Sequence, residues 1–442
     1  MKPWIRQFQA SEILDSRGNP TLAVRCVLTD HSIHEAQVPS GASTGSREAY
    51  EMRDGDSSRY RGLGVLKAIQ AIEGELAQAI LAQQPEDQSS LDRLMIELDG
   101  TTGKTRLGGN SLLGCSMAFS RALAHQQKQP LYRSLYPDLA PALIPVPYLN
   151  IWNGGVHAQW QGSDFQEYMI VPWGAPSFHE AMRWSSEIYH ALQGELKKNH
   201  LPTGVGDEGG FAPPTASNRA PLDFISKAIK QAGLRPGTDV AVALDLAASA
   251  FHGSTGYNLR SENRTLDSLG MVDYCAALAR DYPFLVSLED PLSESDPESW
   301  PTLTERLGHR LQIIGDDIYC TNPSLIENGI RNREANAVLI KPNQIGTISE
   351  TRAAIKQAGR GHWRVMLSHR SGETPDSFIA DLAVASQAGQ IKTGAPARGE
   401  RIAKYNRLMA IERELGSESR YAGPGLARAN LKNSSSQANA RG

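Results

Sequence analysis

The sequence of 442 residues has few cysteines and no long apolar run. Its four cysteines are scattered and form no C-x-x-C pair, so we expect buried, reduced thiols and neither a disulfide framework nor a zinc site. No stretch of about 18 uninterrupted apolar residues is present, so no membrane-spanning helix is expected. The first residues lack the apolar segment of a secretory signal. These absences predict a cytoplasmic globular protein.

An excess of charge of one sign is also missing. The chain has 45 Lys and Arg against 48 Asp and Glu, a formal net charge of -3, which argues against nucleic acid as the default partner. With 40% hydrophobic residues the chain does not belong to the disordered class. Its length suits two to three average domains, or one large barrel with a smaller domain.

The first part of the chain predicts an α+β unit. Strand-like runs at residues 21–28 and 33–38 are followed by helical patterns at 64–82 and 110–127. Prolines at 137, 141, 145 and 147 then mark a boundary. We therefore predict a capping domain at 1–138 and a catalytic domain at 139–425. The segment 426–442, rich in Ala, Asn and Ser, is expected to be disordered.

The second part alternates strands with helices. Short apolar runs end in polar residues at 245, 289, 316, 341, 369 and 392, and after a first gap of 44 residues these ends lie 23 to 28 residues apart. Helical stretches such as 349–358 and 377–388 separate them. This rhythm indicates βαβ units and a parallel sheet. So many units in one block favour an α/β fold of the TIM-barrel type over an open sheet.

Three carboxylates end successive predicted strands: Asp245, Glu289 and Asp316. In a barrel of this type the strand ends meet at one rim, where the active site lies. Carboxylates that converge there repel each other unless a cation lies between them, and oxygen ligands favour Mg²⁺. The alternative is that each carboxylate only caps the helix that follows it.

The next strand end adds a possible base. Lys341 would lie beside the cation and be partly desolvated, and both effects would lower its pKa, as a general base requires. A phosphate-binding or ion-paired lysine is the alternative. His369, Arg370, Ser371 and Lys392 bring further polar and positive groups to strand ends, which implies a substrate with phosphate, carboxylate or both.

Glycine-rich loops complete the candidate site. Residues 204–209 match G-x-G-x-x-G, but no clear strand precedes them and Pro213 and Pro214 oppose a helix, so a dinucleotide site is not expected. Glu208 in this loop suits a general acid. Residues 39–45 have the composition of a mobile lid.

Taken in order, several segments resemble the enolase family of phosphopyruvate hydratases. The motifs are ILDSRGNPT at 13–21, VPSGASTG at 38–45, QEYMI at 166–170, GDEGG at 206–210, LIKPNQIG at 339–346, LSHRSGET at 367–374 and YNRL at 405–408. The resemblance covers nearly the whole chain. It implies an N-terminal α+β cap on a modified eight-stranded β/α barrel, and a dimer or octamer.

The resemblance also implies a reaction: the Mg²⁺-dependent, reversible dehydration of 2-phospho-D-glycerate to phosphoenolpyruvate in glycolysis and gluconeogenesis. Lys341 would remove the α-proton, and Glu208 would assist the loss of hydroxide. Two Mg²⁺ are expected, the first held by Asp245, Glu289 and Asp316 and the second with help from Ser43. The implied substrate-binding residues are His157, Gln166, Glu167, Glu289, Asp316, His369, Arg370, Ser371 and Lys392.

Some positions depart from the family pattern, among them Gly109, Trp152, Ala250 and Gly399. Two alternatives therefore stay open. One is an enolase-like carboxyphosphonoenolpyruvate synthase, which would use the same base and metal on a phosphonate analogue. The other is a non-catalytic scaffold of enolase descent, which would have no physical need for the intact acid, base and carboxylates.

Overall fold

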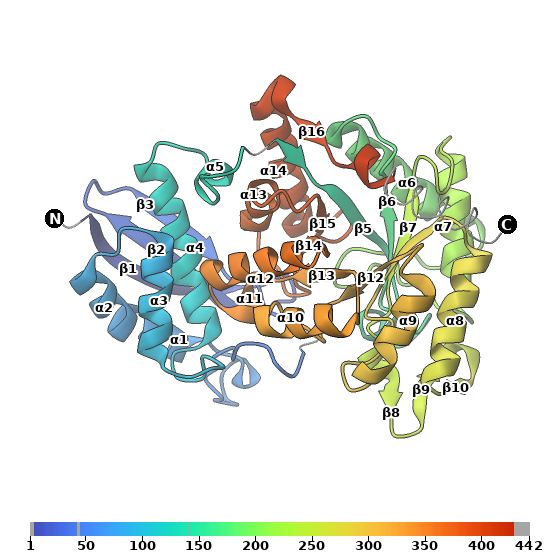
Figure 1. Ribbon diagram of the computed structural model, residues 1–442, viewed down its shortest axis with the longest axis horizontal. Coiled ribbons are helices and arrows are strands. Elements are labelled where there is room, and N and C mark those ends of the chain that lie inside the picture. Colours follow the sequence, from blue (N-terminus) through green and yellow to red (C-terminus); the bar gives the residue numbers. More distant parts are fainter. Residues whose placement is uncertain (1–3, 42–44, 141, 428–442) are drawn as a thin grey trace.

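The computed structural model describes residues 4–41, 45–140 and 142–427. Ser43, and most of the predicted tail at 426–442, lie outside the described residues. Figure 1 shows a smaller N-terminal unit beside a larger barrel, with α4 (Gly109–Gln126) between the N-terminal sheet and the rest of the molecule. The boundary predicted between residues 138 and 139 stays a prediction.

The N-terminal unit is built on a three-stranded antiparallel sheet of β1 (Ile5–Leu14), β2 (Pro20–Leu28) and β3 (Ile33–Gln37). The sequence analysis predicted β2 and β3 but missed β1. This strand is at the sheet edge, and only Ile5 and Phe8 of its ten residues are buried, so its apolar signal is weak.

Helices cover this sheet. The predicted helical pattern at 64–82 is α1 (Leu66–Ala71), a π-helical turn (Ile72–Leu76) and α2 (Ala77–Gln83). After α3 (Gln88–Asp99), helix α4 is buried along most of its length, because it packs on β2 and β3 and also meets α11 (Pro342–Ile345) and α12 (Ile348–Arg360). Small and apolar residues on most sides of α4 suit this position between packed elements.

The second unit is a closed eight-stranded barrel with neighbours in the order β11, β12, β13, β14, β15, β5, β6, β7. Its strands are β5 (Val146–Asn153), β6 (Glu167–Val171), β7 (Ala241–Asp245), β11 (Leu285–Glu289), β12 (Gln312–Gly315), β13 (Ala337–Ile340), β14 (Arg364–Ser368) and β15 (Gln390–Lys392). The barrel prediction is thus confirmed. The strands from β7 onward coincide with the predicted runs.

The parallel sheet predicted from the runs between residues 240 and 392 is confirmed for β7 and β11 to β15. The strand β6 was not among those runs, and it is antiparallel to both β5 and β7. The connection from β5 to β6 contains only a short 3₁₀ turn (Gly155–Ala158), so the chain returns directly. Two helices, α6 (Phe178–Lys198) and α7 (Ala220–Gln231), then separate β6 from β7. Because two helices follow β6 instead of one, β7 begins at the same end of the barrel at which β6 ends. The strands β6 and β7 are therefore antiparallel.

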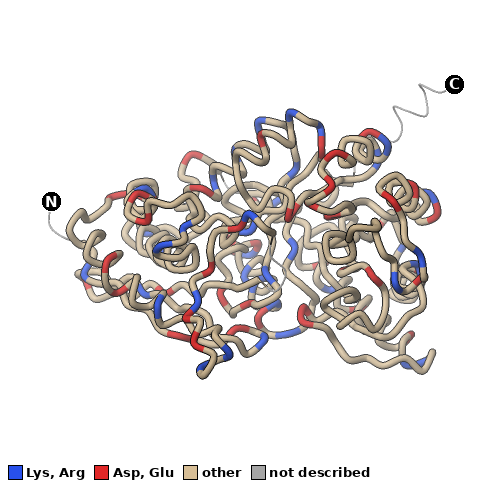
Figure 2. Tube along the Cα trace, turned by 90° about the horizontal axis from the view of Figure 1, so that it is seen from below, with Lys and Arg blue, Asp and Glu red and all other residues tan. Residues whose placement is uncertain are grey.

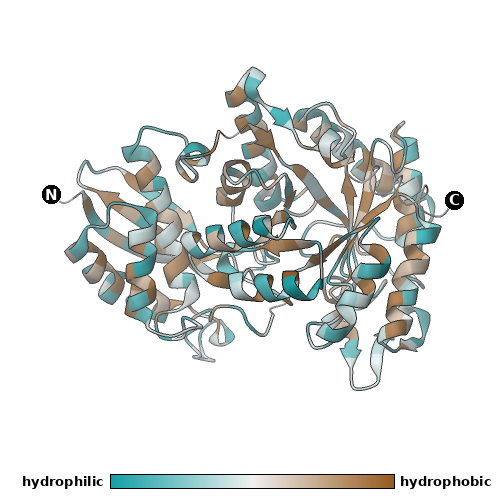
Figure 3. Ribbon diagram, viewed as in Figure 1, coloured by the Kyte–Doolittle hydropathy of each residue, from teal (hydrophilic) through white to brown (hydrophobic). Residues whose placement is uncertain are grey.

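Outside the barrel lie the remaining elements. They are α5 (Leu131–Ser134), α8 (Ser268–Asp281), α9 (Trp300–Leu307), α10 (Pro323–Asn332), α13 (Phe378–Ala385) and α14 (Gly399–Leu415), a small sheet of β8 (His252–Gly253), β9 (Gly256–Leu259) and β10 (Arg264–Leu266), and the pair β4 (Leu143–Ile144) and β16 (Arg420–Tyr421). Figure 3 shows apolar strands in the interior and helices whose outer faces are hydrophilic. Acidic and basic residues are interspersed over both units (Figure 2).

Apolar side chains fill the barrel, including Tyr148, Met169, Val286, Leu339 and Met366. Each fully buried side chain of this size stabilises the fold by roughly 2–3 kcal/mol. The interior is therefore a packed core, and only the rim is left for chemistry. None of the helices in the described ranges could cross a bilayer on length and apolarity.

The N-terminal unit closes over this rim through specific contacts. The backbone of Ser40 and that of Gly372 exchange two hydrogen bonds, of 2.7 and 2.9 Å. Arg121 of α4 forms an ion pair of 2.7 Å with Asp376. The contact of Ser40 brings the beginning of the predicted lid next to Gly372, which directly follows Arg370 and Ser371.

Candidate active site

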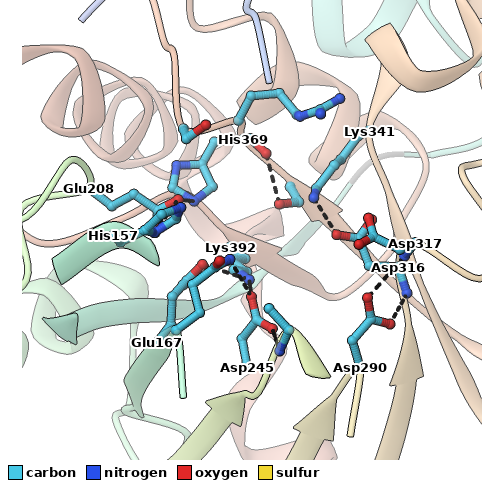
Figure 4. Close-up of a pocket in the computed structure, with 15 residues that line it drawn as sticks. His157, Glu167, Glu208, Asp245, Asp290, Asp316, Asp317, Lys341, His369 and Lys392 are labelled. Atoms are coloured by element: carbon cyan, nitrogen blue, oxygen red, sulfur yellow. Dashed lines mark hydrogen bonds and ion pairs between the residues drawn. The ribbon is translucent and has the colours of Figure 1, made fainter. Parts of the chain in front are cut away.

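The predicted site residues gather around one cavity at the barrel rim (Figure 4). Those that line it are His157, Gln166, Glu167, Glu208, Asp245, Asp316, Lys341, His369, Arg370, Ser371 and Lys392. Glu289 lies next to the cavity, with Lys392 against its carboxylate. Asp290, Asp317, Ala247 and Ser368 also line the cavity and were not predicted.

Strand register brings these side chains to one level. Asp245 at the end of β7 is opposite Glu289 at the end of β11. Glu167 is opposite Asp245 on the other side, although it is the first residue of its strand. Because β6 is reversed, its beginning lies at the rim where the parallel strands end. The reversal thus explains how Gln166 and Glu167 reach the cavity.

Lys392 is the centre of a buried ion cluster. Its Nζ lies 3.0 Å from Glu167 and 2.9 Å from both Asp245 and Glu289. Burial lowers the pKa of Lys392, but these carboxylates outweigh it and hold the pKa well above its ordinary value. Burial and then the neighbouring carboxylates raise the pKa of both Glu167 and Glu289. One cation is thus shared among several anions.

Lys341 forms an ion pair with Asp316. Burial lowers the pKa of Lys341, but Asp316 raises it more, and the net pKa lies above its ordinary value. A carboxylate in direct contact thus outweighs desolvation at Lys341, and the lowering expected beside a bound cation stays a prediction. Asp316 also accepts a 2.9 Å hydrogen bond from Gln344, and its own backbone N–H donates to Asp290 at 2.8 Å. The position of Asp316 is thereby fixed.

Glu208 lies on the opposite wall of the cavity, in the predicted loop (Figure 4). Its Oε2 accepts a 2.9 Å hydrogen bond from Asn150, and its Oε1 lies 3.7 Å from His157 Nδ1 and 3.6 Å from His369 Nε2. Burial raises the pKa of Glu208, but the surrounding donors and cations bring it below its ordinary value. Burial, and then Glu208, raise the pKa of Glu167, so the pKa values of these two carboxyls are shifted in opposite directions.

Other residues that contact the site were missed by the sequence analysis. Glu48 of the N-terminal unit accepts two hydrogen bonds from the Arg370 guanidinium, at 2.9 and 3.1 Å. Asn150 holds Glu208, and Arg401 of α14 donates to His369. None of the three follows a predicted barrel strand. Of the three, only Glu48 could have been suspected from the sequence, because it comes soon after the predicted lid.

The donor set fits a divalent cation. In the described part of the chain, His157 Nδ1, Gln166 Oε1, Glu167 Oε2 and His369 Nε2 are buried without a hydrogen-bond partner. Ligand atoms of Asp290, Asp316 and Asp317 lie within 4.8 Å of one another, as do those of His157, Glu167 and Glu208. Burial and then Asp316 raise the pKa of Asp317 to about 7. A cavity with surplus carboxylates and unpartnered polar atoms is suited to cations and a polar ligand.

The departures from the family pattern lie away from the cavity. Among the described residues that line it, none is Gly109, Trp152, Ala250 or Gly399. Trp152 is buried and stacks on Phe224 with ring centroids 5.7 Å apart. A Cβ at position 109 would come within 2.8 Å of Ala49 Cβ, which explains a glycine there. None of these four departures therefore changes a side chain that lines the cavity.

Comparison with known proteins agrees with this geometry. Residues 5–135 match the family model for the enolase N-terminal domain, and residues 141–430 match that for the enolase C-terminal TIM barrel domain. The chain is 52% identical over 419 residues to Enolase 1 of Methanospirillum hungatei JF-1, which covers 95% of this chain and 97% of that protein. With both domains matched along their length and the predicted residues gathered at one rim, this chain belongs to the enolase family.

Proposed function

We propose that this protein is a carbon–oxygen lyase, a phosphopyruvate hydratase, that reversibly dehydrates 2-phospho-D-glycerate to phosphoenolpyruvate with Mg²⁺. The observation that carries the proposal is the placement of Lys341 and Glu208 on opposite walls of one cavity, with Lys392 between them (Figure 4). A base and an acid on opposite sides of a substrate can remove a proton from one carbon and assist departure of a hydroxyl from the next. The role in glycolysis and gluconeogenesis, the cytoplasmic location and the oligomeric state stay predictions.

Proton removal is the difficult step. A proton α to a carboxylate is very weakly acidic, because its loss adds charge to an existing anion. Lys341 takes this proton, and Lys392 offsets the charge that develops on the substrate carboxylate. Arg370, Ser371 and His369 bind the substrate from the same rim, together with His157, Gln166 and Glu167. Burial of Lys392 strengthens its effect, since little water screens it.

Glu208 assists the departure of hydroxide. Its lowered pKa means that it has to receive a proton first, and Glu167, whose pKa is raised and whose carboxylate lies within 4.8 Å, can carry one. The two carboxyls belong to one cluster with His157. We therefore assign Glu208 as the acid, supplied with a proton by Glu167.

Asp245, Glu289 and Asp316 would hold the first Mg²⁺, and Ser43 would help to hold the second. When bound there, Mg²⁺ would supply positive charge that offsets the charge on the substrate and weakens the hold of Asp316 on the Lys341 proton. The surplus of carboxylates over cations around Lys392 supports this assignment.

The test uses the full chain with 2-phospho-D-glycerate and Mg²⁺, and measures phosphoenolpyruvate by absorbance and deuterium at C2 by NMR in D₂O. Glu208→Gln is expected to exchange the α-proton but to form little product, and Lys341→Ala to do neither. Glu187→Gln and Lys356→Ala, which change exposed residues, serve as matched controls. Exchange by Lys341→Ala at the wild-type rate would overturn the assignment of the base.

The same assay separates the alternatives. Turnover of the phosphonate analogue and not of 2-phospho-D-glycerate would identify a carboxyphosphonoenolpyruvate synthase. Failure with both substrates in the presence of Mg²⁺ would favour a scaffold. The departures from the family pattern do not line the cavity, which favours 2-phospho-D-glycerate.

A further inference from the structure

Arg401 on α14 is fully buried beside the cavity without lining it. Its Nη1 donates to the imidazole Nδ1 of His369 and, at 2.6 Å, to the carbonyl of Arg370. Its Nη2 donates to the carbonyls of Ser371 at 2.7 Å and Asp207 at 3.2 Å. The guanidinium thus joins the segment 369–371 to the loop that carries Glu208.

These contacts decide the tautomer of His369. A guanidinium has only donors and keeps its protons at any pH a protein tolerates. The Nδ1 atom that it contacts therefore has to be an acceptor, so the proton of a neutral His369 is on Nε2. This Nε2 is buried, has no hydrogen-bond partner within the described protein and lies 3.6 Å from Glu208 Oε1.

We propose that Arg401 is a positioning residue that fixes His369 as the Nε2–H tautomer, so that the imidazole offers a hydrogen-bond donor to Glu208 and to the substrate. With the opposite tautomer, Nε2 would present a lone pair to the Glu208 carboxylate, and the two would repel each other. His369 is then a donor that orients the acid and the departing oxygen, and it is not a base. The catalytic part of this inference rests on the proposed function, whereas the tautomer does not.

The backbone around Arg401 leaves room for its side chain. Gly394 has a φ of 84°, and a Cβ there would lie 2.8 Å from Arg401 Cδ and 2.9 Å from the carbonyl oxygen of Glu208. That carbonyl in turn accepts a 2.9 Å hydrogen bond from the Ala395 N–H. Any other residue at position 394 would have a strained backbone, and its Cβ would be too close to Arg401 and Glu208. Glycine at this position therefore allows the segment after Lys392 to pack against both Arg401 and the Glu208 loop.

The first test measures the tautomer in the wild-type protein, so it needs no variant to fold. The chain is labelled with ¹⁵N-histidine, and the signals of His369 among the 11 histidines are identified by their loss in His369→Asn. The proposal predicts a protonated Nε2 and an unprotonated Nδ1 in a long-range ¹H–¹⁵N spectrum at pH 7. A protonated Nδ1, as the only proton or as one of two, would overturn it.

The second test compares Arg401→Lys with Arg407→Lys on the same helix. Arg407 pairs with Asp381 and Glu414 and does not line the cavity, so it controls for the loss of a guanidinium on α14. Lysine keeps the charge at 401 but cannot make the same set of hydrogen bonds. We expect kcat to fall about 100-fold in Arg401→Lys, with a much smaller change in KM and a mixture of His369 tautomers. A kcat within twofold of the control would overturn the positioning role.

The two measurements separate this inference from the proposed function. If the wild-type chain dehydrates no substrate, the proposed function fails, while the tautomer spectrum still decides the effect of Arg401. If the chain is active and His369 is protonated on Nδ1, the inference fails and the proposed function is unaffected. A purely structural role for Arg401 would lower the melting temperature without changing the tautomer in the folded protein, and that result would also overturn the proposal.

Discussion

Two regions of the molecule contain buried carboxylates, and they differ in how many partners each carboxylate has. At the contact between the N-terminal unit and the barrel, each buried carboxylate has its own partners: Asp376 pairs with Arg121, and Asp92 accepts from the Ser349 N–H at 2.8 Å. In the cavity, Glu167, Asp245 and Glu289 share Lys392. Matched partners stabilise an interface, whereas an excess of anions is costly unless cations bind. The mismatch therefore marks the functional region.

The pKa values of these carboxylates have different causes in the two regions. The carboxylate of Asp376 has a pKa below its ordinary value, because Arg121 and backbone N–H groups outweigh its burial. Glu167, Glu289 and Asp290 are buried too, and there neighbouring carboxylates add to the effect of burial and raise each pKa. At the contact, Asp92 also has a raised pKa, but there burial is the cause and the hydrogen bonds to Asp92 oppose it, whereas in the cavity the neighbouring carboxylates add to the effect of burial.

Among the tests of this difference between the two regions, removal of the metal should have the largest effect on activity. Exhaustive chelation is expected to abolish turnover, since the surplus carboxylates would then face the substrate anion. Adding Mg²⁺ should raise the melting temperature, because a cation that binds only the folded protein stabilises it by about 2.7 kcal/mol at 100 times Kd. Calorimetry with Asp316→Asn as control measures this, and full activity after chelation would contradict the metal assignment.

Replacing the shared cation comes next. Lys392→Met leaves several buried carboxylates without their common partner, and activity should fall by a factor of about 1000 or more, with a loss of roughly 3–5 kcal/mol in unfolding free energy. Lys104→Met is the matched control, because Lys104 forms a 2.9 Å ion pair with Glu350 and neither residue lines the cavity. This control should lose some stability and keep its kcat. Equal losses of activity in the two variants would contradict the comparison.

A smaller effect is expected where the two units meet at the substrate. Glu48→Gln removes the charge that holds the Arg370 guanidinium, so Arg370 should be less well oriented for a phosphate. We expect KM to rise about tenfold and kcat to change less. Steady-state kinetics beside Glu187→Gln checks this, and an unchanged KM would show that Arg370 needs no support from Glu48.

The smallest effect concerns Asp92, whose burial raises its pKa to about 6. The folded protein then binds more protons than the unfolded chain between about pH 4 and pH 6, so this group makes the unfolding free energy fall as the pH rises through that window. The contribution is at most about 3 kcal/mol. Asp92→Asn should make this fall shallower, as urea unfolding at several pH values measures. An unchanged slope would mean that Asp92 titrates normally.

The sequence predicted the strand ends of the barrel well, because each one is a local pattern. A run of apolar residues that ends in Asp245, Glu289 or Lys392 can be found without knowing what lies across the barrel. The parallel rule then places these ends at one rim. Glu167 could not be found in this way and was assigned only by resemblance. Its strand runs in the opposite direction, so the residue at the rim is the first of the strand and not the last.

Residue types, their order and their spacing therefore determined the barrel, the family and most of the groups around the cavity. Only the tertiary structure decided that Glu48 holds Arg370, that Arg401 contacts His369, and that Asp316 opposes the effect of burial on the pKa of Lys341. These partners are 322, 32 and 25 residues apart along the chain. A local pattern fixes which way a side chain faces, but the balance of charge around a buried group depends on every element packed against it.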